Sequence, residues 1–168
     1  MDDAIVCYAY QSGLVGGLAL AVTDRGVRSI TFTGQETRAL QPPRHSIMES
    51  LISELDAYFR GTPIVFSTPL DPAFGTTFQR RVWDALIAIP YGQTRSYGQI
   101  AAEIGNPKAA RAIGQANSVN RIPILIPCHR VIGRHGSLGG YSSGLGLKRT
   151  LLDLEGVDLG AASELKKG

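Results

Sequence analysis

A proline-rich stretch near the middle divides this chain into two halves with different patterns. Residues 62–75 read TPIVFSTPLDPAFG, with three prolines in fourteen residues, a density that interrupts both helices and central strands. Before this stretch, the runs IVCYAY, GGLALAV and VRSITFTG are short and rich in β-branched or aromatic residues, as strands are. After it, apolar residues recur mostly at helical spacing. We therefore expect an α+β protein of two small domains, residues 1–74 and 75–168.

The first half predicts a small antiparallel sheet followed by one helix. TDRG separates the second and third strand-like runs and is typical of a hairpin turn. The later segment SIMESLISELDAYFRG places Ile47, Leu51, Leu55 and Phe59 at helical spacing, and Gly61 is the expected end of that helix.

The second half predicts a mostly helical domain. TTFQRRVWDALIAIP begins with capping threonines, ends at Pro90, and places on one face Phe78, Val82, Leu86 and Ile89. Two short helices are expected next, one from Ser96 to Gly105 and one with Asn106 as N-cap and Pro107 as its first residue. Joined by a tight glycine-containing turn, they form a helix-turn-helix pattern. Residues 121–141 look extended and turn-rich, and LGLKRTLLDLEG predicts a last amphipathic helix.

Composition and cysteine content point to a cytoplasmic protein. The hydrophobic fraction is 43% and the charged fraction 18%, values that are ordinary for a soluble globular protein. No apolar run has the length of a membrane span, and the acidic start MDDAIVCYAY does not resemble a signal peptide. In a reducing compartment the two cysteines, Cys7 and Cys128, are expected to stay free.

The two halves carry opposite net charge. Residues 1–74 have five basic and eight acidic side chains, a net charge of −3, whereas residues 75–168 have twelve and six, a net charge of +6. A basic half suggests a polyanionic partner. A solvated basic surface explains the same count, so charge alone does not decide.

The second helix of the helix-turn-helix pattern has an unusual composition. Its small residues leave Arg111 as the one long side chain among Ala109, Ala110, Ala112, Gly114 and Ala116. Recognition helices in the major groove usually carry several long polar side chains. An Ala/Gly face instead suits close, sequence-independent docking in a narrow groove, with Arg111 as a single probe. Taken alone, the stretch favours the simpler alternative, that alanine stabilises the helix and lets it pack tightly.

Cys128 lies in the apolar run IPCHRVI, between a proline and a histidine. A buried cysteine is most often an inert small hydrophobe. Zinc binding is disfavoured because no other Cys or His stands at zinc-ligand spacing. A nucleophilic role needs a nearby base or positive charge, and His129 and Arg130 follow directly. In an extended strand His129 would point away from the sulfur, so contact requires a water relay or a sharp turn at Pro127. Glu155 is a candidate to orient the imidazole.

These segments together resemble the O6-alkylguanine-DNA alkyltransferases, also called methylated-DNA–protein-cysteine methyltransferases. SYGQIAAEIGNPKAARAIGQAN, NRIPILIPCHRVIG and GGYSSGLGLKRTLLDLEG occur in the family's order and spacing, from about Thr76 to Gly156. The first half is similar only in character. The resemblance implies direct reversal of DNA damage by a monomer without a cofactor or metal. An O6-alkylguanine is flipped out of double-stranded DNA bound through its minor groove, and its alkyl group passes irreversibly to a cysteine in a single turnover. O4-alkylthymine is a further possible substrate.

The resemblance also implies a role for each matching residue. Cys128 would accept the alkyl group, His129 would activate it through water, and Glu155 would orient His129. Asn120 would brace the active-site turn, and Tyr97 would turn the target phosphate and donate a hydrogen bond to the flipped base. The resemblance therefore implies that the Ala/Gly face of the helix contacts DNA, whereas the stretch taken alone favoured simple packing.

Two further groups of residues are implied. The surface that contacts DNA would comprise Arg111, which fills the gap left in the base stack, with Ser96, Lys108, Ala109, Ala110 and Gly114. The substrate pocket would be lined by Pro123, Val131, Tyr141, Ser142 and Ser143.

The chain departs from the family pattern at two positions. Arg121 stands where the family usually has proline, which adds charge near the loop expected to face DNA. Ser143 stands where glycine is common, and this predicts a narrower pocket that restricts bulky alkyl groups. Zinc ligands of some relatives' N-terminal domains have no counterpart, and Cys7 is expected to be structural.

The sequence also bears on three alternatives to the alkyltransferase interpretation. In non-catalytic lesion binders of the same fold another residue, commonly tryptophan, replaces the cysteine, so Cys128 argues against that function. A helix-turn-helix transcription regulator would be expected to have a further DNA-binding or cysteine-rich module. A cysteine hydrolase would carry its own nucleophile signature, which this sequence lacks.

Overall fold

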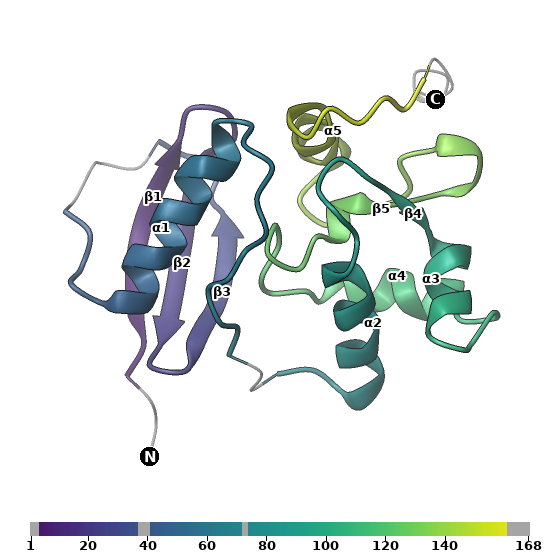
Figure 1. Ribbon diagram of the computed structural model, residues 1–168, viewed down its shortest axis with the longest axis horizontal. Helices are drawn as coiled ribbons and strands as arrows, with labels where there is room; N and C mark the ends of the chain where they lie inside the picture. Colours follow the sequence, from purple (N-terminus) through teal and green to yellow (C-terminus); the bar gives the residue numbers. More distant parts are fainter. Residues whose placement is uncertain (1–3, 37–40, 72–73, 161–168) are drawn as a thin grey trace. The chain divides into compact units, whose positions relative to one another are not determined.

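The computed structural model describes residues 4–36, 41–71 and 74–160 (Figure 1). The chain divides into two compact units. The first comprises Met1–Phe74 with Arg121–Pro123, and the second comprises Gly75–Asn120 with Ile124–Gly168. The first unit ends with the proline-rich stretch, except that it also includes three residues that come shortly before Cys128 in the sequence. Within the described residues, no helix is long and apolar enough to span a membrane.

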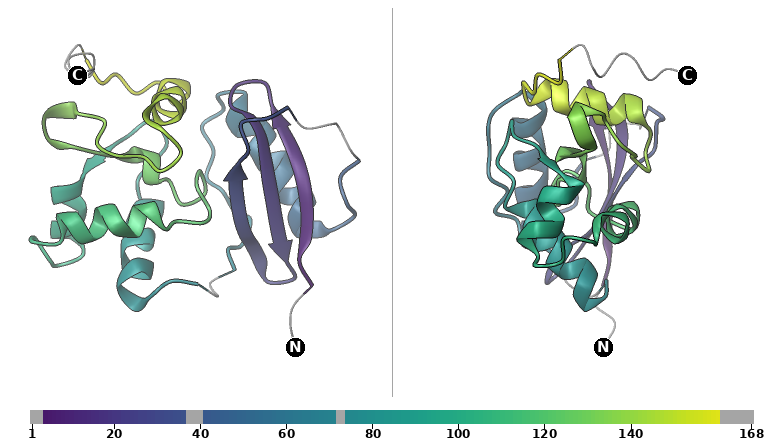
Figure 2. Two further views of the ribbon diagram at one scale, coloured as in Figure 1. Left: turned by 180° about the vertical axis from the view of Figure 1, so that it is seen from behind. Right: turned by 90° about the vertical axis from the view of Figure 1, so that its right-hand side faces the viewer.

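The first unit is an antiparallel sheet with one helix on one of its faces. The strands β1 (Val6–Ser12), β2 (Gly16–Thr23) and β3 (Gly26–Phe32) pair in chain order. The helix α1 (Ser46–Phe59) covers one face of this sheet, and in the reversed view of Figure 2 the strands lie in front of it. Leu18, Leu20 and Val22 of β2 are fully or almost fully buried, because alternate residues of a strand point to one face.

The buried stripe of α1 differs from the predicted one. The buried residues are Met48, Leu51, Leu55 and Tyr58, whereas Ile47 and Phe59 are only partly buried. A constant step of four residues rotates about 40° too far at each step around a helix of roughly 3.6 residues per turn. Alternating steps of three and four keep the side chains on one face, so the ends of the predicted stripe were wrong.

The proline-rich stretch is fastened to the first unit at two places. Beside β3, the Val27 amide donates to the Pro69 carbonyl at 2.8 Å, and the Asp71 amide donates to the Val27 carbonyl at 2.9 Å. On α1, the Glu54 carboxylate accepts from the backbone amides and hydroxyls of Ser67 and Thr68. Burial alone would raise the pKa of Glu54, but these hydrogen bonds lower it. The stretch therefore belongs to the fold of this unit.

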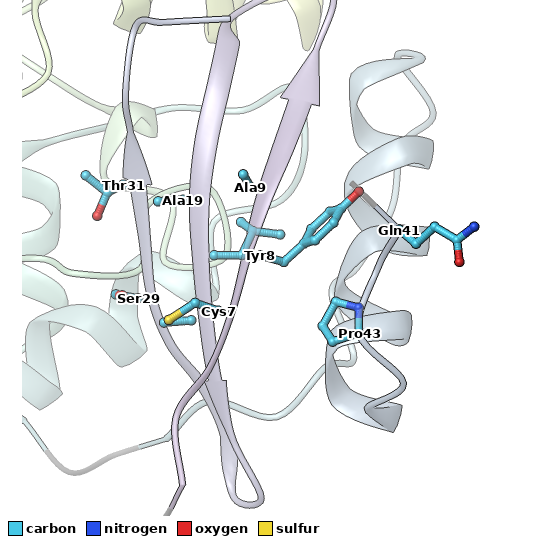
Figure 3. Close-up of a pocket in the computed structure, with 10 residues that line it drawn as sticks. Cys7, Tyr8, Ala9, Ala19, Ser29, Thr31, Gln41 and Pro43 are labelled. Atoms are coloured by element: carbon cyan, nitrogen blue, oxygen red, sulfur yellow. The ribbon is translucent and has the colours of Figure 1, made fainter. Parts of the chain in front are cut away.

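A hollow lies on the sheet face opposite α1 (Figure 3). Its volume is about 480 Å³, and its lining includes Cys7 and Ala9 of β1, Ala19 of β2 and Thr31 of β3. These side chains are small, so they fill little of the hollow. Cys7 is exposed here with a free thiol, and the expectation that it packs as a structural residue was wrong.

The second unit is helical around two very short strands. In chain order its elements are α2 (Thr77–Ile87), β4 (Arg95–Ser96), α3 (Tyr97–Glu103), α4 (Ala110–Ser118), η1 (Cys128–Arg130), β5 (Val131–Ile132), η2 (Arg134–Gly136) and α5 (Leu145–Leu154). Capping boxes begin two of the helices, Thr76 with Gln79 for α2 and Ser96 with Gln99 for α3. The Trp83 indole donates to the Ala116 carbonyl at 3.1 Å and joins α2 to α4.

The second helix of the helix-turn-helix begins later than expected. Asn106 and Pro107 lie in a turn closed by a hydrogen bond from the Ala109 amide to the Asn106 carbonyl at 2.9 Å, and α4 starts at Ala110. Proline is as favourable at the second position of a turn as at the first position of a helix. The local sequence therefore did not distinguish these two conformations.

Candidate active site

A sharp turn places Cys128 in the second unit. Pro127 has φ −79° and ψ 65°, and the Cys128 amide donates to the Ile126 carbonyl at 2.8 Å, which together describe an inverse γ-turn. Cys128–Arg130 then form one turn of 3₁₀ helix. Residues 121–126 are bends and turns and not an extended strand, and a sharp turn at Pro127 was one of the two possibilities that the sequence left open.

The loop that leads to this turn holds a strained residue. Ile124 has φ +74° and is 1% exposed. A positive φ is rare for a β-branched side chain and is maintained only where the surroundings enforce it. Ile122, Leu125 and Ile126 are also buried, so close packing fixes the path of the chain into the cysteine.

Asn120 holds the sulfur in place. Its Nδ2 donates to the Cys128 Sγ at 3.3 Å and to the Ile126 carbonyl at 2.9 Å. Cys128 is 5% exposed. Burial raises the pKa of the Cys128 thiol, and this outweighs the lowering by the Asn120 hydrogen bond, the Lys148 charge and the Tyr141 hydroxyl. The resting thiol is therefore protonated at neutral pH, and its use as a nucleophile requires a base.

His129 and Glu155 form a buried pair beside the cysteine. The His129 Nε2 lies 2.6 Å from the Glu155 Oε1, and both side chains are inaccessible to solvent. Burial favours the neutral carboxylic acid, but bonds and charges from His129 and Arg130 lower the pKa of Glu155 to about 2. Glu155 is thus ionised and only accepts, so Nε2 carries the ring hydrogen and Nδ1 is the basic atom of the neutral ring. Burial lowers the pKa of His129, against the opposing effect of Glu155.

Two buried cations lie next to this pair: Arg130, which was expected near the thiol from its place in the sequence, and Lys148, which was not predicted. The Arg130 Nε and Nη2 donate to Glu155 at 2.8 and 3.0 Å. Lys148 is completely buried, and its Nζ donates to the carbonyls of Val131 at 2.6 Å and Gly140 at 3.2 Å. Burial lowers the pKa of Lys148 to about 8. Basic residues within otherwise apolar stripes were the available signal, but such residues are usually solvated.

Tyr97 lies at the start of α3 and is flanked closely by two other segments. A Cβ added to Gly139 would come within 3.0 Å of the Tyr97 ring, and one added to Gly114 of α4 would lie 3.9 Å from it. Burial raises the pKa of Tyr97, and the nearby Cys128 raises it further. The structure therefore brings the ring of Tyr97 together with α4 and with the loop after β5.

The residues predicted to contact DNA divide into exposed and buried ones. Lys108, Ala110 and Arg111 are exposed and Gly114 is partly exposed, so they can meet a partner. Ala109 is 5% exposed and packs mainly into the core. The Ser96 hydroxyl accepts from the Gln99 amide at 3.1 Å in the capping box.

The residues predicted to line the pocket come from several segments. Val131 is buried directly after the turn that carries the cysteine, Tyr141 is partly buried, and Ser142 and Ser143 are exposed. Burial raises the pKa of the Tyr141 hydroxyl, and the nearby Cys128 raises it further. Pro123 is buried and belongs to the first unit. Across the described ranges of the chain, no group of three or more His, Cys, Asp or Glu side chains is placed to hold a metal ion.

Comparison with known proteins covers nearly the whole chain. Residues 77–157 match the DNA binding domain of 6-O-methylguanine DNA methyltransferase, and residues 5–72 match its ribonuclease-like domain. The methylated-DNA–protein-cysteine methyltransferase of Methanosarcina acetivorans is 46% identical, over 89% of this chain and 97% of that protein. The Mycobacterium leprae protein of the same name is 56% identical, over 77% of this chain and 78% of its own.

Solved structures give the same result. The Mycobacterium tuberculosis O6-methylguanine methyltransferase superposes with a TM-score of 0.78 at 42% identity, over 90% of this chain and 93% of that one. The Mycobacterium tuberculosis OGT protein in complex with DNA superposes with a TM-score of 0.77 at 46% identity, over 88% and 90%. Both the sequence and the fold therefore place this chain in the methylated-DNA–protein-cysteine methyltransferase family.

Proposed function

We propose that this protein repairs O6-alkylguanine in double-stranded DNA by moving the alkyl group to Cys128. The observation that carries the proposal is the geometry of the site, in which Asn120 donates to the Cys128 sulfur and Glu155 contacts the neighbouring His129 ring. The membership of the family and the DNA complex of the Mycobacterium tuberculosis relative support it. The protein is proposed to act as a monomer in the cytoplasm.

The transfer begins with activation of the thiol. The His129 Nδ1 takes the Cys128 proton through a water molecule, and Glu155 stabilises the resulting imidazolium from the other side of the ring. The sulfur then forms a bond to the alkyl carbon while the bond from that carbon to O6 breaks. The electron pair stays on the guanine, where a hydrogen bond from the Tyr97 hydroxyl stabilises the developing charge.

The product explains why one molecule acts once. The reaction converts Cys128 to a thioether, which has no proton to lose and is a poor leaving group. Neither His129 nor Glu155 can regenerate the thiol by proton transfer. Each molecule is therefore consumed by one lesion.

DNA contact is proposed to run through the exposed face of α4. Its small residues allow close approach to the minor groove, and Arg111 fills the gap left by the flipped base. Lys108 is exposed at the preceding turn and would contact phosphate. Flipping costs a few kcal/mol and least for a weakly paired base, so a damaged guanine is favoured over a normal one.

The pocket is proposed to be restricted in size. Val131 and Tyr141 would lie against the base, with Ser142 and Ser143 completing the lining. A serine hydroxymethyl at position 143, where relatives have glycine, reduces the space for large alkyl groups. Methyl groups on guanine O6 and on thymine O4 are the substrates that fit this proposal.

One experiment tests the proposed function. The protein is incubated with a duplex that carries a single O6-methylguanine, and its intact mass and tryptic peptides are measured. A gain of one methyl group on the Cys128 peptide is expected, with no gain in Cys128→Ser. Binding of the duplex without any gain in mass would instead indicate a lesion-binding protein.

A further inference from the structure

The Glu155 carboxylate accepts hydrogen bonds from more than the histidine. Its Oε1 accepts from the His129 Nε2 at 2.6 Å and from the Arg130 Nη2 at 3.0 Å. Its Oε2 accepts from the Arg130 Nε at 2.8 Å and from the Gly92 amide at 3.2 Å. Arg130 therefore binds both oxygens in the two-pronged geometry that guanidinium and carboxylate groups prefer.

Arg130 itself is held by groups outside this pair. Its Nη1 donates to the Ile89 carbonyl at 2.7 Å, and its guanidinium lies 5.9 Å from the centre of the Tyr91 ring. The side chain is 7% exposed. The segment after α2 thus fixes the arginine, and the arginine in turn fixes the carboxylate that the histidine uses.

Charged side chains of both signs act on His129. Glu155 at the end of α5 favours the protonated ring, whereas Arg130 on the same turn and Lys148 on α5 disfavour it. Burial is the largest influence and lowers the pKa of His129; if Glu155 served His129 alone, its negative charge would oppose this lowering more strongly. A ring that is already protonated cannot accept the proton of the Cys128 thiol.

We propose that Arg130 is a positioning residue for alkyl transfer, which by sharing Glu155 keeps His129 neutral at rest and able to take up the thiol proton. This inference rests on the proposed function for its role in the reaction. The link from Arg130 to His129 stands apart from it and can be measured without DNA.

The test follows His129 and the reaction over the same pH range. Nuclear magnetic resonance of ¹⁵N-labelled imidazoles, assigned with His129→Gln, gives the titration midpoint of the ring. Removal of a charged side chain close to a histidine commonly shifts the midpoint of its titration by about one pH unit. Arg130→Gln should therefore raise the His129 midpoint by about that amount. The acid limb of the rate of methyl transfer from an O6-methylguanine duplex should move up with it. The high-pH plateau should change little.

Two further variants complete the design. Arg130→Lys keeps the charge but not the two-pronged contact, so a smaller upward shift is expected; it decides the question if Arg130→Gln does not fold. Arg149→Gln removes a partly exposed arginine on α5 and should shift neither curve. A midpoint that stays or falls, or a rate reduced equally at every pH, overturns the proposal. Failure of the unaltered protein to gain a methyl group would overturn the proposed function while leaving the imidazole titration interpretable.

Discussion

The buried carboxylate of Asp71 in the first unit and that of Glu155 in the second have different surroundings. Asp71 accepts from the Thr23 hydroxyl at 3.1 Å and pairs with Arg28 at 3.1 Å. That arginine is 31% exposed, so water still solvates one side of the pair. Glu155 instead shares its two oxygens between His129 and Arg130, whose side chains are 0% and 7% exposed.

This difference separates a structural use of charge from a chemical one. The Asp71 contacts fasten the proline-rich stretch to the sheet, and no titratable nucleophile lies among them. Around Glu155, a thiol, an imidazole and two cations share an environment from which water is largely excluded, where charges act strongly on one another. Changes at Asp71 should therefore alter stability alone, whereas changes around Glu155 should alter the chemistry as well.

The largest effect is expected from loss of the base. General base catalysis typically contributes about 10²- to 10⁴-fold, so His129→Gln should slow methyl transfer by at least roughly 100-fold. His135→Gln removes an exposed histidine of η2 and is the matched control. Rates are measured by single-turnover transfer from an O6-methylguanine duplex. A His129→Gln rate within threefold of the control would contradict the assigned base.

The second expectation concerns stability in acid. The pKa of Glu155 is lowered from 4.5 to about 2, so the folded state binds this proton less readily than the unfolded state. The stabilisation is present above the unfolded value of about 4.5 and is lost as pH falls toward 2, on the order of 3 kcal/mol. Glu155→Gln should flatten the dependence of unfolding free energy on pH in this window. An unchanged slope would show that other groups dominate.

The third expectation lies in the first unit. Asp71→Ala removes the acceptor for Thr23 and Arg28 and should lower the free energy of unfolding by roughly 2 kcal/mol, with little effect on the transfer rate at a temperature where the protein is folded. Asp24→Ala, at an 85% exposed side chain, should cost less than about 0.5 kcal/mol. Urea denaturation measures both. A large loss of transfer activity in folded Asp71→Ala would contradict the purely structural use of the Asp71 carboxylate.

The smallest of these effects is expected for Arg111→Ala. It should slow repair of duplex DNA by roughly tenfold and reduce the salt dependence of binding by about one counterion. Reaction with free O6-methylguanine base should stay nearly unchanged, because Arg111 is exposed on α4 and is proposed to touch only the duplex. Equal slowing of both reactions would argue that the arginine supports the fold.

Much of the architecture was predictable because it depends on local signals. The antiparallel sheet with one helix and the helical second part were predicted and are confirmed by the fold and by the solved relatives. Capping residues such as Thr76 and Ser96, and alternation in β2, act within a few residues of chain. The family was also recognisable from the segments around Cys128, and the comparisons confirm it.

The misses share a physical cause. The bends before Pro127 and the late start of α4 depend on hydrogen bonds and packing that compete with an equally acceptable local conformation. Arg130 and Lys148 look like surface residues in sequence, since their burial depends on partners tens of residues away. Ala109 is buried although Lys108 and Ala110 are exposed. Its burial depends on where the first turn of α4 begins.

The identity of the acceptor atom is tested most directly by mass. After incubation with an O6-methylguanine duplex, the unaltered protein and Cys7→Ser should each gain one methyl group, located on the peptide that contains Cys128, and Cys128→Ser should gain none. Methylation of Cys128→Ser, or a methyl group found on Cys7 in the unaltered protein, would contradict the account.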